Sequence, residues 1–269
     1  MTVVEPARID DPDDPRIAGY RAIRERDLAG RDRRFVAEGK VVLNVLFSAR
    51  RFEAESALIL DRRLEGMKET LAAAPAGMPV YVAPQAVMDA VAGFHIHRGI
   101  LALGLRRPDE DADALLASLP GDALVVALSG ISNHDNVGAI FRNAAAFEAD
   151  AVLLDATCCD PLYRKAIRVS VGAALKVPFA MLADEAALHA ALDRHGFSQI
   201  ALSPTGRDDI AAISREGRTA LWLGSEGHGL PAATMARMRT ARIAMSAGFD
   251  SLNVATAGAI ALHRLWRER

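Results

Sequence analysis

Three loops of the sequence gather small, polar and charged residues in patterns that suit ligand binding. The last loop, SAGFDSLNV, opens a C-terminal helix, so Ser251 and Asn253 lie on its first turn. The unpaired backbone N–H groups of a first helical turn attract negatively charged or electron-rich ligands. In the loop GSEGHGLP, glycines let the backbone approach a ligand, and Glu226 is the lone carboxylate. The third loop, SGISNHDNVGAIFRN, carries Asn136 and, further along, Arg142.

Each of these features also has a purely structural explanation. Asn136 and Ser251 would serve as helix N-caps, and a single arginine on a helix is ordinarily a surface charge. The letters GHGLPA formally satisfy the dinucleotide fingerprint, but only one strand is expected after them and the chain has no Gly-Lys-Ser/Thr phosphate loop. No Cys/His spacing predicts a metal site, and the adjacent Cys158 and Cys159 cannot close an ordinary disulfide loop.

Composition narrows the class of protein. A chain of 269 residues, 51% of them hydrophobic, can bury a substantial core in one large domain or two. The formal net charge of -2 carries no global basic signature, so a nucleic-acid partner would have to be held by a local patch. The first residues lack the pattern of a signal peptide, and no apolar run is long enough to span a membrane. We therefore expect a globular cytoplasmic protein with no membrane partner.

The N-terminal half reads as a tail followed by a small α/β domain. Residues 1–15 resemble a loose acidic tail, and residues 107–121 resemble a charged linker that contains a short helix. Between them, apolar spacing predicts helices over 16–30, 33–49, 62–73 and 84–92, and strands over 57–60, 79–82 and 99–104. This alternation predicts a separate α/β domain over residues 16–106.

From residue 122 to 269 strands and helices alternate more regularly. Apolar strands are expected at 124–128, 151–154, 177–181, 199–202, 220–223 and 242–245. Strands separated by helices predict a mostly parallel sheet covered on both faces, in which ligands collect at the carboxyl ends of the strands. The three loops each follow one of these strands. The terminal helix is nearly all Ala and Gly over 255–261, so another backbone or a flat ligand can come very close to it.

Taken together, the three loops resemble the SpoU/TrmH family of RNA ribose 2′-O-methyltransferases. The resemblance lies in NVGAIFRNAAAF, LGSEGHGLP and IAMSAGFDSLNVATAGAI, in this order and spacing, and in the intervening segment DPLYRKAIRVSVGAALKVPF. The N-terminal domain is similar to the family's substrate-binding domain and to small ribosomal RNA-binding proteins, through FVAEGKVVLNVL and HRGILAL. One departure is Ala244, where the family usually has proline.

The resemblance implies a fold, a cofactor and an assembly. It implies a C-terminal methyltransferase domain over 122–269 with a SPOUT-type trefoil knot, which binds S-adenosylmethionine in a bent shape. It also implies a homodimer with the terminal helix at its interface, which Leu262, Leu265 and Trp266 would suit. Carried over residue by residue, the cofactor contacts are expected at Gly224, Ile243 and Leu252, with Leu202, Ser203 and Met245 nearby.

The same resemblance implies catalytic roles for Arg142, Glu226, Asn136, Ser251 and Asn253. Because a guanidinium stays protonated in proteins, we expect Arg142 to bind the target phosphate and stabilise the emerging alkoxide. Glu226 would orient Arg142 or accept the proton, while the other three would position the ribose and the loops. The expected substrate is ribosomal RNA rather than tRNA. The alternatives are a tRNA methyltransferase, a non-catalytic RNA-binding protein with this fold, and a nucleotide-dependent oxidoreductase.

Overall fold

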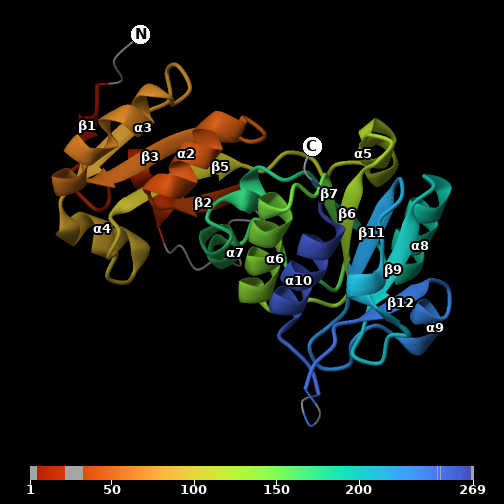
Figure 1. Ribbon diagram of the computed structural model, residues 1–269. Coiled ribbons are helices and arrows are strands. Elements are labelled where there is room, and N and C mark those ends of the chain that lie inside the picture. The colour runs from red at the N-terminus through yellow and green to blue at the C-terminus, as the bar shows by residue number, and fades with distance from the viewer. Residues whose placement is uncertain (1–4, 22–32, 247, 249, 268–269) are drawn as a thin grey trace. The chain divides into compact units, whose positions relative to one another are not determined.

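The chain folds into two compact units (Figure 1). The computed structural model describes residues 5–21, 33–246, 248 and 250–267. Unit 1 comprises Met1–Arg107 and Leu162–Lys176, and unit 2 comprises Pro108–Pro161 and Val177–Arg269. This division differs from the expected domains in two places. All but the first residue of the expected linker belongs to unit 2, and a segment expected in the methyltransferase domain, Leu162–Lys176, belongs to unit 1.

Unit 1 is built on a five-stranded mixed sheet of order β1-β4-β3-β5-β2. The strands are β1 (Ala7–Arg8), β2 (Arg34–Glu38), β3 (Glu53–Leu60), β4 (Val80–Ala83) and β5 (Ile100–Leu105). β1, β4 and β3 are parallel, whereas β5 is antiparallel to β3 and β2. The α-helices are α2 (Lys40–Ala49), α3 (Lys68–Ala72), α4 (Gln85–Ala92) and α7 (Arg164–Val169). Short 3₁₀ helices are η1 (Pro15–Tyr20), η2 (Asp61–Arg63), η3 (Glu65–Met67) and η4 (Ala173–Leu175).

The helix expected over 33–49 is wrong in its first part, which is the strand β2. Phe35, Val36 and Ala37 are all buried, and a short run of consecutive apolar residues fits a buried strand as well as a helix. Gly39 separates β2 from α2 with a φ of 103°, a conformation that favours glycine. The helix expected over 16–30 is described only to residue 21, where the chain forms η1; the rest lies outside the described residues.

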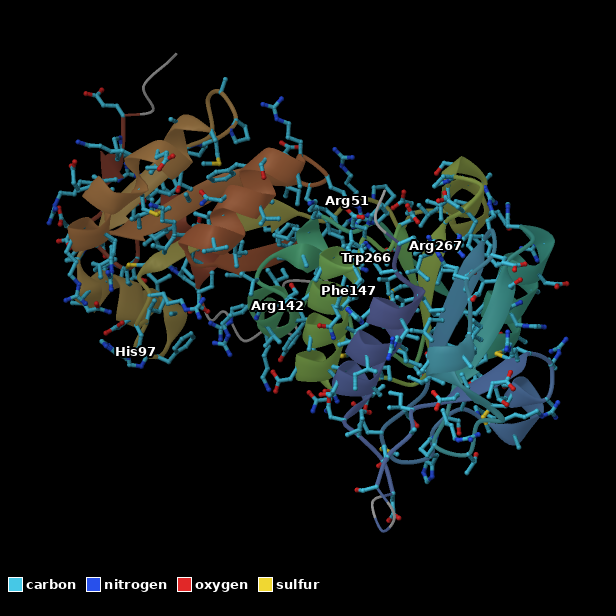
Figure 2. The ribbon with its side chains drawn as sticks, viewed as in Figure 1. Arg51, His97, Arg142, Phe147, Trp266 and Arg267 are labelled. Atoms are coloured by element: carbon cyan, nitrogen blue, oxygen red, sulfur yellow. The ribbon has the colours of Figure 1, made fainter. Side chains whose placement is uncertain are left out.

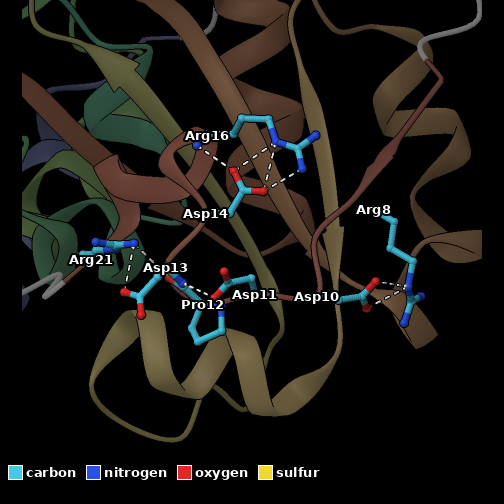
Figure 3. Close-up of polar contacts among 8 residues, drawn as sticks. All are labelled: Arg8, Asp10, Asp11, Pro12, Asp13, Asp14, Arg16 and Arg21. Atoms are coloured by element: carbon cyan, nitrogen blue, oxygen red, sulfur yellow. Dashed lines mark hydrogen bonds and ion pairs between the residues drawn. The ribbon is translucent and has the colours of Figure 1, made fainter.

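The described part of the first fifteen residues is ordered structure rather than a loose tail. Its backbone pairs with β4 through β1, and Ile9 is fully buried in the core of unit 1 together with Tyr20. The acidic side chains that suggested a tail are paired with arginines (Figure 3), in the pairs Arg8–Asp10, Arg21–Asp13 and Arg16–Asp14. Burial of the apolar residues of this segment therefore orders it, even though its composition is acidic.

Unit 2 contains a seven-stranded sheet of order β10-β12-β9-β11-β6-β7-β8, and every pair of neighbours is parallel. The predicted parallel sheet is thus confirmed. Its strands are β6 (Leu124–Leu128), β7 (Ala151–Asp155), β8 (Phe179–Leu182), β9 (Ser198–Leu202), β10 (Asp208–Asp209), β11 (Thr219–Leu223) and β12 (Arg239–Arg242). The helices are α5 (Ala112–Ser118), α6 (His134–Ala146), α8 (Glu185–Arg194), α9 (Ala232–Met235) and α10 (Val254–Leu265), with the 3₁₀ helix η5 (Ile210–Ala212).

Helices cover the unit 2 sheet in two layers (Figure 1). α6 and α10 lie side by side on one face, and α5 and α8 lie on the other, where Leu116 and Leu188 are fully buried. The glycine in α10 allows close packing, since a Cβ atom at Gly258 would lie 2.9 Å from Leu223 Cδ1. No helix of the described residues is long and apolar enough to cross a membrane.

Candidate functional site

The loops that follow β9, β11 and β12 meet the start of α10 around one cavity of about 570 Å³. Its lining includes all six residues expected to contact the cofactor, namely Leu202, Ser203, Gly224, Ile243, Leu252 and Met245. It also includes three of the five expected catalytic residues, Glu226, Ser251 and Asn253. The strand expected at 242–245 lies a few residues earlier, as β12, so Ile243 and Met245 belong to the loop that enters the cavity wall.

A chain of side-chain hydrogen bonds joins three of the predicted residues. Asn253 Nδ2 donates to Asn136 Oδ1 at 2.9 Å, and Asn136 Nδ2 donates to Glu226 Oε1. Asn253 Oδ1 accepts from the backbone N–H groups of Ala255 and Thr256 at 3.0 and 3.2 Å. Since these N–H groups fix which end of the Asn253 amide faces α10, the direction of every following bond is fixed too. Glu226 stands at the accepting end of this chain.

The two helix caps differ from the expectation. Asn133 caps α6 by accepting from Asp135 N, so Asn136 lies in the first turn, with 8% of its surface exposed. Asn253, not Ser251, caps α10. The sequence offers several Asn and Ser residues near each helix start, and capping propensity alone does not separate them. Because Asn133 caps α6, the side chain of Asn136 is available to donate to Glu226.

The loop 224–231 approaches its own backbone so closely that Gly224 tolerates no side chain. A Cβ atom there would lie 2.4 Å from Leu230 N and 2.5 Å from Gly229 C, and backbone atoms cannot move aside as a side chain could. Gly229 N donates to Ser225 O at 2.9 Å, with a φ of 67° at Gly229. The following helix, α9, has only four residues, so this loop does not open the long helix that a dinucleotide site requires.

Arg142 lies apart from the other predicted residues. It is exposed on α6 (Figure 2) and, within the described part of the chain, forms no hydrogen bond or ion pair with Glu226. It follows Asn136 by six residues, which is about 9 Å along a helix axis. Among the residues that the structure describes, no direct contact between Glu226 and Arg142 supports the expectation that Glu226 orients Arg142.

Two positioning residues were not singled out from the sequence. Asn143 Nδ2 donates to Ala255 O at 2.8 Å and so holds the first turn of α10 against α6. Asp155, buried at the end of β7, accepts from Gly130 N at 3.1 Å and from Thr157 Oγ1 at 2.6 Å, which fixes the loop before α6. Burial opposes ionisation of Asp155, but the hydrogen bonds from Thr157 and Gly130 lower its pKa overall. An Asp two residues before a Thr at a strand end was the available signal.

The remaining polar groups of unit 2 do not suggest a nucleophile or a metal centre. Burial raises the pKa of Cys158 to about 12 and that of Cys159 to about 11, so neither thiol ionises readily. The described residues contain no group of three or more His, Cys, Asp or Glu side chains able to hold a metal ion.

Comparison with known proteins identifies the family. The model of the SpoU rRNA Methylase family matches residues 123–263. An uncharacterized tRNA/rRNA methyltransferase of Mycobacterium tuberculosis is 42% identical over 268 residues, covering 96% of this chain and 90% of its own. A 23S rRNA (guanosine-2′-O-)-methyltransferase of Acinetobacter baylyi is 31% identical, covering 78% and 86% respectively.

The solved structures agree with the fold. The crystal structure of an AdoMet-bound rRNA methyltransferase from Sinorhizobium meliloti superposes with a TM-score of 0.80 at 23% identity and covers 96% of both chains. At that identity the likeness shows the fold alone, while the family match over 123–263 and the 42% identical relative establish kinship. The chain belongs to the SpoU rRNA Methylase family and is an RNA methyltransferase.

Proposed function

We propose that this protein transfers a methyl group to a ribose 2′-hydroxyl of structured ribosomal RNA, within a homodimer in the cytoplasm. The observation that carries the proposal is the Asn253–Asn136–Glu226 hydrogen-bond chain at the wall of the cavity. The name of the Acinetobacter baylyi relative supports both the 2′-O position and ribosomal RNA. The methyl donor is S-adenosylmethionine, which is bound in the structure from Sinorhizobium meliloti.

The cavity fits this cofactor in size and chemistry. Its volume of about 570 Å³ lies within the range of small-molecule sites. Apolar side chains of Leu202, Ile243 and Leu252 suit a nucleoside ring, and Ser203 and the backbone near Gly224 supply polar partners. Leu252 is 37% exposed and lines the cavity, so a bound ligand would cover it. We propose these residues, with Met245, as the cofactor contacts in a knotted domain.

The residues of the chain would activate and orient the hydroxyl. S-adenosylmethionine supplies an electrophilic methyl group on a sulfonium. A ribose hydroxyl is a poor nucleophile at neutral pH, so its proton must leave or its developing charge must be stabilised during attack. Glu226 is exposed and lines the cavity, and one of its carboxylate oxygens accepts from Asn136, so the carboxylate is placed to accept a proton. Asn136 and Asn253 hold Glu226 in place, and Ser251 lies where it can contact the ribose.

Arg142 has the charge that the substrate requires. An exposed guanidinium can form two parallel hydrogen bonds with an RNA phosphate and stabilise negative charge on the attacking oxygen. Because Arg142 lies about two helical turns from Asn136, we propose that it serves the Glu226 site of the second subunit of the dimer. A composite site of this kind would make activity depend on assembly.

The exposed face of α6 and α10 supports the dimer. Ile260 and Trp266 expose 37% and 36% of their surfaces, and Figure 2 places Phe147 beside Trp266 at the ends of the two helices. Large exposed apolar side chains on adjacent helices are typical of an interface. Leu262 and Leu265, expected at the interface, are instead fully buried inside the chain. Trp266 therefore remains a proposed contact, and Ile260 replaces the two leucines.

Transfer of radiolabelled methyl groups to unmodified RNA tests the substrate. Separate pools of ribosomal RNA and tRNA, each lacking modifications, are incubated with the protein and labelled S-adenosylmethionine. Label in ribosomal RNA at one mapped nucleotide is the expected result. Label confined to tRNA would overturn the substrate, and cofactor binding without transfer to either pool or to partly assembled ribosomal subunits would overturn the catalytic role.

A further inference from the structure

An aromatic and basic surface of unit 1 has no part in the methyl-transfer site. It comprises the loop between α4 and β5, the first turn of α2 and the exposed side of α7. We refer to it as the Phe94 surface, and define it by Lys40, Phe94, His97, Arg98, Arg164 and Arg168. Phe94 is unusually exposed: phenylalanine side chains are usually buried, but 39% of the surface of Phe94 is accessible.

The loop that carries Phe94 is held rigidly from below. Ile96 is buried in the core of unit 1 with 2% exposure. Its backbone N–H donates to Asp89 Oδ1 at 2.9 Å, and its carbonyl oxygen accepts from Gln85 Nε2 at 3.1 Å. Because these hydrogen bonds anchor the backbone of the loop at Ile96, less backbone entropy is lost when a partner binds to Phe94 and His97. Figure 2 marks His97 on this loop.

One side of the Phe94 ring is occupied by a cation that is itself fixed. The Arg164 guanidinium carbon lies 4.9 Å from the ring centroid, a cation–π geometry. Arg164 also donates to Glu38 Oε2 at 3.1 Å, and Arg168 lies 3.9 Å from the same oxygen. Glu38 is buried with 7% exposure, and its negative charge is paired with these two arginines. The remaining exposed part of the ring faces solvent.

Two further cations, Arg98 and Lys40, lie next to Gly39, which directly follows the Glu38 carboxylate that binds Arg164. The Arg98 side chain lies against Gly39, with Nη1 3.1 Å from where a Cβ atom of Gly39 would be, next to Lys40. The other carboxylate that contacts this loop, Asp89, already accepts hydrogen bonds from Ile96 and Gln85. An exposed aromatic ring on the same surface as arginines and a lysine combines a stacking platform with phosphate-binding charge.

We propose that the Phe94 surface binds an unpaired nucleotide of RNA, with its base stacked on Phe94 and its flanking phosphates held by Lys40 and Arg98. Unpaired bases, unlike those of an RNA duplex, can be splayed out and stacked on aromatic side chains. The inference rests on the proposed function, because it takes RNA as the substrate, and it adds a requirement for a single-stranded element that unit 1 holds.

The test compares two RNA probes and two matched substitutions in the full-length protein. The probes are a fluorescently labelled hairpin with a single-stranded loop and the fully paired duplex of its stem. In fluorescence anisotropy titrations, Phe94→Leu should weaken hairpin binding about 5- to 150-fold, the range for loss of one stacked base, with little effect on the duplex. Phe94→Tyr keeps the ring and should bind the hairpin as the wild type does.

A salt titration tests the charged part of the surface. Arg98→Gln should reduce the slope of log affinity against log salt by about the contribution of one phosphate contact. S-adenosylmethionine binding, measured in the same preparations, should be equal in all variants because the cofactor cavity belongs to unit 2. Equal cofactor binding shows that unit 2 is folded in each variant, and an unchanged circular dichroism spectrum and melting temperature show that unit 1 is folded as well.

The outcomes separate this inference from the proposed function. If Phe94→Leu binds the hairpin as tightly as the wild type, or loses hairpin and duplex binding equally, the inference is wrong even if the wild type methylates ribosomal RNA. The proposed function then stands, and the Phe94 surface would belong to another partner. If the wild type binds neither probe and methylates no RNA, both are wrong.

Discussion

Substitutions at Asn253 separate the two roles that the structure gives this side chain. Its Oδ1 atom caps α10, and its Nδ2 atom holds Asn136, which in turn holds Glu226. Asn253→Ala removes both roles. Asn253→Asp keeps an oxygen for the cap and places a negative charge at the helix N-terminus, which is favourable, but it cannot donate to Asn136.

The expected change in stability follows from the cap. Loss of an Asn cap costs about 1 kcal/mol and loss of one hydrogen bond between neutral groups costs about another. Because Asn253 is exposed, we expect Asn253→Ala to lower the free energy of unfolding by about 1–2 kcal/mol, or the melting temperature by about 2–8 °C. Asn253→Asp keeps the cap and loses only the hydrogen bond to Asn136, so it should lower the free energy of unfolding by about 1 kcal/mol.

The expected change in activity follows from the hydrogen-bond chain. In Asn253→Asp, an oxygen faces Asn136 Oδ1; if the Asn136 amide turns over, its oxygen faces Glu226 instead. A lost bond to a charged group costs about 1.5–3 kcal/mol, so kcat/KM should fall about 10- to 100-fold. Calorimetry and single-turnover methyl transfer provide the two measurements. Wild-type turnover by Asn253→Asp would refute the positioning role, and an unchanged melting temperature of Asn253→Ala would refute the cap.

Three further outcomes are expected. Gly224→Ala should abolish binding of S-adenosylmethionine in calorimetric titration, because its Cβ atom would lie 2.4 Å from Leu230 N. Gly121→Ala, a control in open space away from the site, should bind the cofactor normally. Tight binding by Gly224→Ala would contradict the loop geometry. Burial raises the pKa of Cys158 to about 12 from the ordinary 9.0, so the folded protein keeps a proton that the unfolded chain releases. The free energy of unfolding in urea should therefore be insensitive to this thiol below pH 9 and fall as pH rises from 9 to 12, more steeply than in Cys158→Ala; equal slopes would argue against the shift. Ile260→Asp on the exposed face of α10 should shift the protein to monomers in sedimentation experiments and reduce methyl transfer, and an intact, active dimer would place the interface elsewhere.

The regular alternation of strands and helices made unit 2 predictable. A parallel strand that is buried on both faces, such as β6, appears in the sequence as a continuous apolar run. When predicted helices flank such a run, it indicates a buried strand. Glycines at the strand ends, such as Gly224, indicate the ligand loops, because a backbone that is approached this closely has no room for a Cβ atom. The cavity that these loops line is therefore where the sequence led us to expect it.

Features that depend on long-range packing were less predictable. The residues of β2 fit a helix as well as a strand, because three consecutive buried residues carry no period. Nothing local to Leu162–Lys176 indicates that it packs with unit 1, since this depends on partners such as Glu38, more than a hundred residues earlier. The choice between Asn133 and Asn136 as a cap depends on Glu226, which is distant in the sequence and close in space.

The position of the transferred methyl group tests the central claim most directly. Alkaline cleavage of RNA requires a free 2′-hydroxyl to attack the neighbouring phosphate, so a 2′-O-methylated nucleotide stays joined to the next one. Unmodified ribosomal RNA is labelled by the wild type and by Arg142→Ala, then hydrolysed in alkali and separated. We expect label in alkali-resistant dinucleotides from the wild type and a large loss of label with Arg142→Ala. Label in mononucleotides would show methylation of a base and would contradict it.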